Sequence, residues 1–302
     1  MYDIVIVGAG PAGLTAALYA RRMGKTVLVL EKSTFGGQIT FSPKVENYPG
    51  TMQMSGNEFA DRLVEQVLAQ GADIEMETVT AVEDRGTVKL VITEEGSHEC
   101  RSVIIAAGVR HRQLGLPREN EFVGAGISYC AVCDGAFYKG QHVAVIGGGN
   151  SALQEAILLA ETCSKVIIVQ NLPFLTGEQS LQDVLATRKN IEVILGTVVT
   201  GLTGESELTG LELRKEESGE TSTLSVDGMF VAIGLEPVNE AFRDVAALDE
   251  RGYLDTDEAC VTNTPGVFVA GDCRRKGVRQ ITTAIADGAT AALAACRYLD
   301  TL

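Results

Sequence analysis

The chain has 302 residues, 45% of them hydrophobic and 22% charged, which is enough for two domains of roughly 150 residues each. Its 25 Lys and Arg against 40 Asp and Glu give a net charge of −15 at pH 7. That charge repels phosphate backbones and anionic lipids, so we exclude nucleic acid and membrane surfaces as partners. No apolar run approaches the roughly 18 residues of a membrane span and no basic leader is present, so we expect a cytoplasmic protein.

The first predicted element is a buried strand that runs into a glycine turn and a helix. Ile4 to Val7 is short and β-branched, and Gly8, Gly10 and Gly13 follow it as G-x-G-x-x-G. The first glycine permits the turn, the second lets the backbone approach a pyrophosphate, and the third lets helix and strand pack closely. Glu31 ends the next apolar run, where a carboxylate accepts hydrogen bonds from ribose hydroxyls. The pattern predicts a dinucleotide-binding fold.

The next chemical motif is a pair of cysteines in the middle of the chain. Cys130 and Cys133 are the only two of the seven cysteines that lie close together, and Asp134 follows them. The C-x-x-C spacing brings two sulfurs within reach of one disulfide, and one thiolate of such a pair is often reactive at neutral pH. Because Asp134 is placed to move protons between thiol and thiolate, we interpret all three residues as catalytic.

Two other interpretations of this pair stay open. One is a pair of inert buried thiols, although Asp and Gly beside the cysteines suit a turn better than a core. The other is a zinc site, which needs a second pair of ligands. We predict no metal, because the remaining candidates show no such spacing: His98, Cys100, His111 and His142.

The strand–turn–helix–strand pattern occurs a second time. Asp3 to Glu31 aligns without a gap on His142 to Gln170. Two such units predict an α/β protein with two Rossmann-like, three-layer ββα dinucleotide-binding domains. The second glycine turn is the G-x-G-x-x-A variant, and its candidate nucleotide-binding residues are Gly147, Gly149, Asn150, Ser151 and Ala152.

The second unit differs from the first at the position expected for the ribose. Gln170 stands where Glu31 stands in the first unit, and it is neither the acid that binds a free 2′-hydroxyl nor the Arg that binds a 2′-phosphate. Asn171 to Thr176 contains no positive charge, whereas a phosphate clamp needs Arg or Lys. The sequence therefore argues against specific NADPH binding.

Motifs along essentially the whole chain, taken in order, resemble one family. They are Gly8 to Gly13, Gly36 to Ile39, Val45 to Gly50, Ala106 to Gly108, Cys130 to Gly135, Gly147 to Ala152, Gly271-Asp272 and Arg279-Gln280. The family is the low-molecular-weight bacterial thioredoxin reductases, class II of the flavoprotein pyridine nucleotide-disulfide oxidoreductases. The resemblance implies a homodimer with one FAD per chain. It also implies a discontinuous FAD-binding domain, at 1–112 and 240–302, into which the disulfide-carrying NAD(P)H-like domain, 113–239, is inserted.

Carried over to this chain, the resemblance implies a role for each matching residue. The first glycine turn and Glu31 would hold the FAD pyrophosphate and ribose, and Asp272 would contact the ribityl chain. Cys133 would lie nearer the flavin, Cys130 would attack the disulfide of thioredoxin, and Asp134 would be the acid/base. The implied FAD-binding residues are Gly8, Gly10, Pro11, Ala12, Gly13, Glu31, Gly37, Gln38, Ile39, Asn47, Ala107, Gly108, Asp272, Arg279, Gln280 and Ile281.

The chain departs from this family at the electron donor. Family members that use NADPH carry His-Arg-Arg and a further Arg just after the second-domain strand, and Gln170 to Thr176 has none of them. A similar group of flavoproteins lacks that signature and takes electrons from ferredoxin. The flavoprotein subunit of alkyl hydroperoxide reductase, which this segment also resembles, uses NADH.

We therefore expect an FAD-dependent thioredoxin-disulfide reductase whose donor is ferredoxin or another molecule that is not NADPH. One alternative is an NADH-dependent disulfide reductase serving a peroxiredoxin or a glutaredoxin-like protein. The other is a flavin-binding redox sensor with a vestigial nucleotide site.

A basic stretch beside the expected flavin bears on the choice of partner. Arg274, Arg275, Lys276 and Arg279 put four cations into six residues. On the surface, such a patch would steer an acidic ferredoxin or thioredoxin. The other interpretation is a solvated loop with ordinary surface charge.

Overall fold

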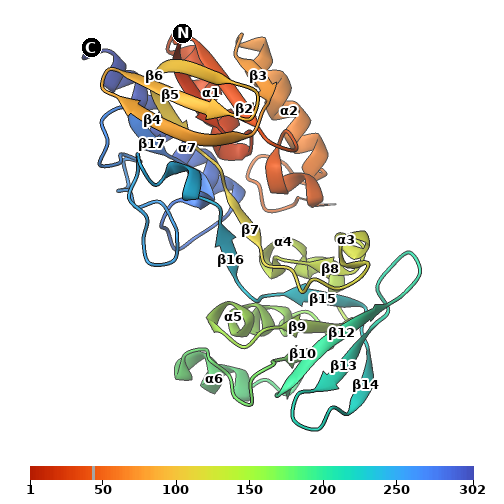
Figure 1. Cartoon of the computed structure of the whole chain (residues 1–302). Helices are drawn as coiled ribbons and strands as arrows, with labels where there is room; N and C mark the ends of the chain where they lie inside the picture. Colours follow the sequence, from red (N-terminus) through yellow and green to blue (C-terminus); the bar gives the residue numbers. More distant parts are fainter. Residues whose placement is uncertain (43–44) are drawn as a thin grey trace. The chain divides into compact units, whose positions relative to one another are not determined.

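The computed structural model of this chain describes residues 1–42 and 45–302, which form two compact units (Figure 1). The first unit is made of two stretches, Met1–Arg110 and Glu236–Leu302. The second unit, His111–Leu235, is inserted between them. Where the chain crosses between the units, β7 (Val109–His111) pairs with β16 (Leu235–Pro237).

The first unit is built on a parallel sheet whose strands are short and β-branched. Its central strand β1 (Tyr2–Val7) is buried over its last four residues, as expected for a strand covered on both faces. The parallel strands, in spatial order, are β3 (Asp73–Met76), β2 (Val27–Glu31), β1, β6 (Ser97–Ile105) and β17 (Val267–Val269). An antiparallel ribbon, β4 (Val79–Arg85) and β5 (Val88–Thr93), continues from β6.

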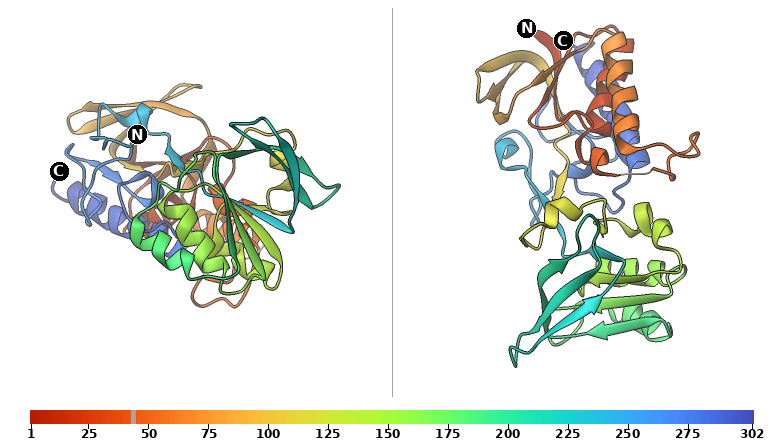
Figure 2. Two further views of the ribbon diagram at one scale, coloured as in Figure 1. Left: turned by 90° about the horizontal axis from the view of Figure 1, so that it is seen from below. Right: turned by 90° about the vertical axis from the view of Figure 1, so that its right-hand side faces the viewer.

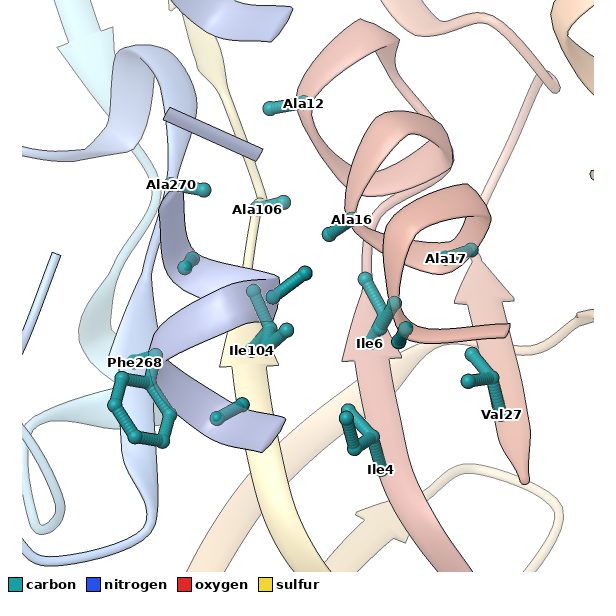
Figure 3. Packing of buried hydrophobic residues seen from close by; sticks show 14 of the residues in the cluster. Ile4, Ile6, Ala12, Ala16, Ala17, Val27, Ile104, Ala106, Phe268 and Ala270 are labelled. Carbon is teal, nitrogen blue, oxygen red and sulfur yellow. The ribbon is translucent and has the colours of Figure 1, made fainter. Parts of the chain in front are cut away.

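Three helices cover one face of this sheet, and the antiparallel ribbon lies on the other side (Figure 2, right). They are α1 (Pro11–Arg22), α2 (Gly56–Ala69) and α7 (Ile281–Leu299). Figure 3 shows Ile4, Ile6 and Ile104 of the strands packed beneath Ala16 and Ala17 of α1. Short 3-10 turns complete the unit at η1 (Gly37–Phe41), η3 (Glu240–Phe242) and η4 (Gly271–Cys273).

The second unit repeats this plan on a smaller scale. Its parallel sheet has the order β11 (Ile191–Ile194), β10 (Lys165–Val169), β9 (His142–Ile146), β15 (Gly228–Val231) and β8 (Ile127–Ser128). One apolar cluster joins the sheet to α5 (Asn150–Leu159), and another joins it to an antiparallel sheet of β12 (Thr197–Thr203), β13 (Gly210–Lys215) and β14 (Thr221–Ser225). The remaining elements are α3 (Glu119–Phe122), α4 (Ala131–Asp134), η2 (Gly135–Tyr138) and α6 (Gln179–Ala186).

These two sheets confirm the predicted α/β class, with one Rossmann-like three-layer fold inserted into another. Both strand–glycine turn–helix–strand units form where the sequence placed them. Among the described residues, no helix is both long and apolar enough to cross a bilayer.

Candidate functional site

The first candidate site lies at the carboxyl edge of the parallel sheet in the first unit. Val7 at the end of β1 pairs with Ile105 at the end of β6, and Ile105 also pairs with Val269 of β17. Immediately beyond, Gly8 takes a positive φ of 102°, and a Cβ at this position would clash with the carbonyl oxygen of Ala106. Ligands of open α/β sheets bind at this edge, so the fold brings the predicted residues to the expected place.

The N-terminus of α1 leaves its backbone N–H groups open. Gly10 is the N-cap without a side-chain cap, and Pro11 is the first helical residue. A Cβ on Gly10 would meet only the carbonyl oxygen of Gly36 at 3.9 Å, whereas a Cβ on Gly13 would clash with Gly8. The turn is thus closely packed at Gly13, where the helix meets the strand, and open at Gly10, where the helix begins. This open helix N-terminus fits the pyrophosphate of a dinucleotide.

The Glu31 carboxylate is fixed against this turn at the end of β2. One oxygen accepts the Ala9 N–H at 2.8 Å, and the other accepts the N–H and hydroxyl of Ser33 at 3.0 and 3.3 Å. A carboxylate offers about four acceptor positions, so capacity for one further hydrogen bond is left. This arrangement fits the predicted bond from a ribose hydroxyl.

Two pairs of predicted flavin-lining residues, far apart in sequence, come together in the first unit. Asn47 Nδ2 donates to Gln280 Oε1 at 3.3 Å, and Ile39 packs in the same apolar cluster as Ile281. Gln280 is also the N-cap of α7 in a capping box with Thr283, so this helix points its N-terminus at the group.

A second set of predicted residues follows the ends of β2 and β6. Gln38 donates its amide to the carbonyl oxygen of Val109. A Cβ on Gly37 would meet Gly10 at 3.4 Å, and Ala107 lies beside the first glycine turn. Gly108 has a positive φ of 69° and open space around it. The sheet edge is therefore lined by backbone rather than by bulky side chains.

Asp272 in η4 carries a buried oxygen that pairs only with Lys276 among the described residues. Its Oδ1 is buried without a hydrogen bond from the described residues, and Lys276 Nζ lies 3.1 Å away as an ion pair. Burial raises the pKa of this carboxyl, and the Lys276 charge opposes that rise. A carboxylate oxygen has two lone pairs, so beside the Lys276 ion pair Oδ1 keeps acceptor capacity that fits the predicted hydrogen bond from a ribityl hydroxyl.

The basic stretch of this loop is not a surface patch, so that hypothesis is wrong. The Arg274 side chain is 5% exposed and makes two hydrogen bonds to Asp287, at 2.9 and 3.0 Å. Lys276 is almost as buried, and its Nζ lies 3.0 Å from Asp287. The aspartates that neutralise these cations lie in η4 and α7, so the charges point into the unit.

The other two cations of the stretch are also engaged. The Arg279 guanidinium lies 4.2 Å above the ring of Tyr253 and donates to the carbonyl oxygen of Asp272 at 3.3 Å. Arg275 is exposed but pairs with Asp255 at 2.9 Å. The stretch therefore stabilises the loop beside the candidate flavin site and is a poor docking surface.

The second candidate site is the disulfide turn that follows β8. Cys130 and Cys133 are joined by a disulfide, and Cys130 Sγ accepts the N–H of Cys133 at 3.2 Å. Because the two sulfurs are bonded to each other, this geometry favours the redox interpretation over a zinc site. The remaining cysteines are free thiols buried in apolar surroundings: Cys100, Cys163, Cys260, Cys273 and Cys296.

Asp134 closes this turn with one oxygen engaged and one free. Its Oδ2 accepts the Ser128 hydroxyl at 2.6 Å, while Oδ1 is buried without a partner among the described residues. Burial raises the pKa of the Asp134 carboxyl, and the bond from Ser128 opposes the rise. A buried carboxyl with a raised pKa and a free oxygen is suited to proton transfer.

The glycine turn of the second unit has the predicted backbone. Gly147 takes a positive φ of 129°, and Gly149 is the N-cap of α5 without a side-chain cap. Asn150 exchanges two hydrogen bonds with Glu178, at 2.8 and 3.0 Å. This last contact ties the start of α5 to the segment that follows β10.

Gln170 lies directly on this second turn. It is 5% exposed, and a Cβ on Gly148 would clash with its side chain. The Gln170 amide donates to the carbonyl oxygen of Phe174 at 3.4 Å. The N–H groups of Thr176 and Gly177 donate to the carbonyl oxygen of Gly148, at 2.8 and 2.9 Å. The segment thus folds across the turn and places a neutral amide where the first unit has Glu31.

Three residues contribute in ways that were not predicted from the sequence, and Lys276 was considered only as part of a surface patch. Ser128, Lys276 and Asp287 each act through a buried contact with a residue from another element. The sequence signal was Asp287 itself, an acid flanked by small and apolar residues within α7. An isolated charge on an apolar helix face indicates a buried partner.

One further cluster of titratable side chains lies in the first unit. Ligand atoms of Glu75, Glu77 and His98 lie within 4.8 Å of one another. His98 Nε2 lies 2.9 Å from Glu77, so a hydrogen bond between the two side chains accounts for this contact. The structure therefore groups His98 with these glutamates and not with the cysteine pair.

Comparisons with known proteins agree with this geometry. A family model described as "Pyridine nucleotide-disulphide oxidoreductase" matches residues 2–288. A thioredoxin reductase of Treponema pallidum is 40% identical over 302 residues, covering 100% of this chain and 98% of the relative. A 34.2 kDa protein in the rubredoxin operon of Clostridium pasteurianum is 40% identical over 298 residues, covering 98% and 97%. The crystal structure of a thioredoxin reductase from Streptococcus pyogenes superposes with a TM-score of 0.96 at 38% identity, covering 100% and 99%.

Proposed function

Since this chain belongs to the pyridine nucleotide-disulphide oxidoreductase family, we propose that it is a thioredoxin-disulfide reductase that uses the Cys130–Cys133 disulfide. The observation that carries the proposal is this disulfide, followed directly by a buried carboxyl with one free oxygen. Relatives named thioredoxin reductase that cover the whole chain support thioredoxin, or a thioredoxin-like protein, as the substrate.

The family implies FAD as the cofactor, and the first unit offers residues that fit it. The open N-terminus of α1 would take the pyrophosphate, Glu31 a ribose hydroxyl, and Asp272 Oδ1 a ribityl hydroxyl. FAD, when bound, passes reducing equivalents from a donor to the protein disulfide. These three anchors come from different elements, so they fix the position of a long cofactor at several points.

The cysteines then carry two electrons to the partner by thiol–disulfide exchange. In the reduced pair, the Cys130 thiolate attacks one sulfur of the partner disulfide, and the departing sulfur takes a proton through Asp134. Cys133 then attacks Cys130, which releases the second partner sulfur as a thiolate and restores the Cys130–Cys133 disulfide. The partner gains two electrons from the pair, one of its sulfurs takes a proton through Asp134, and the other is protonated by water.

We further propose that the electron donor is ferredoxin or another molecule that is not NADPH. The support is the segment after β10, which has no cation between Gln170 and Thr176 and exposes Phe174. A bound 2′-phosphate would find an apolar side chain and a neutral amide there, where it needs Arg or Lys.

NADH is the second candidate donor, and the intact glycine turn of the second unit favours it. Gly147 and Gly149 leave the N-terminus of α5 uncapped by side chains, which suits a pyrophosphate. In that case a peroxiredoxin or a glutaredoxin-like protein would be the partner served. A flavin-binding redox sensor would keep this turn without using it.

We also propose a homodimer, as the resemblance to the family implies.

The test is anaerobic mixing of the FAD-loaded protein with NADPH, NADH and reduced ferredoxin in separate experiments. The measurements are the loss of flavin absorbance and then the appearance of thioredoxin thiols. We expect fast bleaching with ferredoxin or NADH and slow bleaching with NADPH. Fast bleaching by NADPH contradicts the donor proposal. Bleaching that never yields thioredoxin thiols contradicts the reductase, and Cys130→Ser is the control that removes exchange.

A further inference from the structure

The hydroxyl of Ser128 connects the two halves of the disulfide turn. It donates to Asp134 Oδ2 at 2.6 Å and accepts the N–H of Cys130 at 3.1 Å. Ser128 is 4% exposed and lies on β8, where it pairs with Phe230 of β15. The hydroxyl is therefore held by a buried strand on one side and holds the redox turn on the other.

We propose that Ser128 is a positioning residue for disulfide exchange, which orients the Asp134 carboxyl so that Oδ1 is the atom that exchanges the proton. This inference rests on the proposed function, because it assumes that Asp134 serves the cysteine pair. It assigns to Ser128 a role in the chemistry in addition to its place in the strand.

The geometry supports this role because a serine hydroxyl has only one proton to donate. The short bond to Asp134 uses that proton, so Oδ2 is engaged and the carboxyl has one preferred orientation. Oδ1 is buried and has no partner among the described residues. An unsatisfied buried oxygen is costly unless it has a function.

The same bond also controls when Asp134 carries its proton. A hydroxyl that donates to a carboxylate stabilises the charged form, which opposes the effect of burial on the pKa of Asp134. Without it, the carboxyl would hold its proton to higher pH and would have no fixed orientation. Loss of Ser128 should therefore change the pH dependence as well as the rate.

The exchange step accounts for all atoms and electrons. The Cys130 thiolate forms a bond to one partner sulfur, the bond between the two partner sulfurs breaks, and the departing sulfur accepts the proton of Asp134 Oδ1. When Cys133 later attacks the Cys130 sulfur, the second partner sulfur departs as a thiolate, and the proton released from the Cys133 thiol returns to Asp134. The pair is oxidised by two electrons, and the partner is reduced by the same two.

Two other titratable groups lie on elements of the second unit that pack against the turn. Burial, assisted by the charge of Asp134, raises the pKa of Tyr138 in η2 to about 12. Burial raises the pKa of Glu155 in α5 to about 7. Because Glu155 would titrate in the range of interest, Glu155→Gln is a necessary control. The two cysteines themselves titrate after reduction.

The test uses the FAD-loaded protein with its pair reduced by dithiothreitol and then freed of excess reagent. The rate of alkylation by iodoacetamide is measured between about pH 5 and pH 9, and mass spectrometry assigns the label to Cys130 or Cys133. The variants are Ser128→Ala, Ser128→Thr, Asp134→Asn and Glu155→Gln. The other cysteines are buried, so the label reports on the pair.

We expect the wild-type profile to have a lower inflection that is absent in Asp134→Asn and unchanged in Glu155→Gln. Ser128→Ala should move this inflection to higher pH, and Ser128→Thr should restore it because the hydroxyl returns. An unchanged inflection in Ser128→Ala overturns the proposal. So does a Thr variant that behaves like Ala, since packing would then explain the effect.

Thioredoxin reduction gives a second, separate measurement. General acid–base catalysis is worth roughly 10²–10⁴-fold, and we expect Ser128→Ala to lose about tenfold of the exchange rate because Asp134 remains but is poorly oriented. If the wild-type protein reduces no thioredoxin, the proposed function fails, while the alkylation profile still decides the role of Ser128. If thioredoxin turnover is normal in Ser128→Ala, the positioning role fails alone.

Discussion

The two glycine turns of this chain follow the same backbone path but end in different chemistry. In the first unit, Glu31 accepts the N–H of Ala9 and keeps acceptor capacity for a ligand. In the second, Gln170 packs on Gly148, the residue that corresponds to Ala9, and donates its amide to a carbonyl of its own loop. The comparison indicates that the backbone turn suited to phosphate and the side chain suited to ribose are independent features. The second unit has the glycine turn of the first but lacks the acid at the ribose position.

The largest effect is expected from a variant that adds a methyl group at Gly13, the third glycine of the first turn. Gly13→Ala places a Cβ against the Gly8 carbonyl, and overpacking of this kind costs about 1–3 kcal/mol. We expect FAD retention to fall by up to about 100-fold, because strand and helix must separate at the turn proposed to bind it. Flavin content after gel filtration measures the loss.

The matched control for Gly13→Ala is Ala152→Gly at the same place in the second turn. It removes a methyl that already fits there, so its cost is the roughly 1 kcal/mol of a helical glycine. FAD content should not change. Loss of FAD in both variants would contradict the view that only the first turn holds the flavin nucleotide.

The next test concerns the buried charges that hold the η4 loop of the first unit. Asp287 accepts hydrogen bonds from Arg274, Lys276 and the N–H of Gly271. Asp287→Asn leaves buried cations without their partner, which should lower the free energy of unfolding by about 3–5 kcal/mol. Denaturant unfolding measures it. Asp300→Asn, which breaks an exposed pair with Lys25, is the control and should cost under about 1 kcal/mol.

The stability supplied by Asp287 should also depend on pH. Burial raises the pKa of Asp287, but the bonds from Arg274 and Lys276 outweigh burial and lower it. A carboxyl whose folded pKa is depressed stabilises the protein above its unfolded pKa of about 4, and this stability is lost as pH falls through the folded value. The wild type and Asp287→Asn should therefore converge in stability under acid. A constant difference down to the lowest pH would contradict this account.

A smaller effect is expected when each unit receives the residue that the other has at the ribose position. Glu31→Gln removes a charge-assisted acceptor and should weaken FAD binding by about tenfold. The reciprocal Gln170→Glu should strengthen NADH binding by a similar factor, because it supplies the missing acid. Fluorescence titration with FAD and NADH measures both. Equal NADH affinity in the wild type and Gln170→Glu would mean that residue 170 does not contact the nucleotide.

An effect of similar size tests the missing phosphate clamp. Replacing Asn171 and Leu172 by Arg places two cations directly after Gln170, where the family uses Arg for NADPH. We expect the ratio of NADPH to NADH turnover to rise about tenfold, the value of one charge-assisted contact to phosphate. Steady-state kinetics with both nucleotides gives the ratio. A wild-type protein that already prefers NADPH would contradict the assumption that the segment after Gln170 has no site for the 2′-phosphate.

Local motifs carried most of what could be predicted from the sequence. The glycine turns depend on residues a few positions apart, and so does the pair formed by Cys130 and Cys133. The α/β class follows from them directly. The basic stretch was misjudged because Asp287, which buries Arg274, lies thirteen residues further on in a helix. The role of Ser128 depends on a bond that forms only when β8 and α4 have folded.

Gly148 has a consequence for how variants of this chain should be interpreted. An alanine at 148, as at the corresponding Ala9, leaves no room for Gln170 in its present rotamer. The two positions are therefore coupled, and the effect of a substitution at one depends on the residue at the other. Random mutagenesis that samples one position at a time would measure the effect of each change only with the present residue at the other position. The joint replacement of Gly148 by Ala and Gln170 by Glu tests whether the second fold can regain both residues that the first has at these positions.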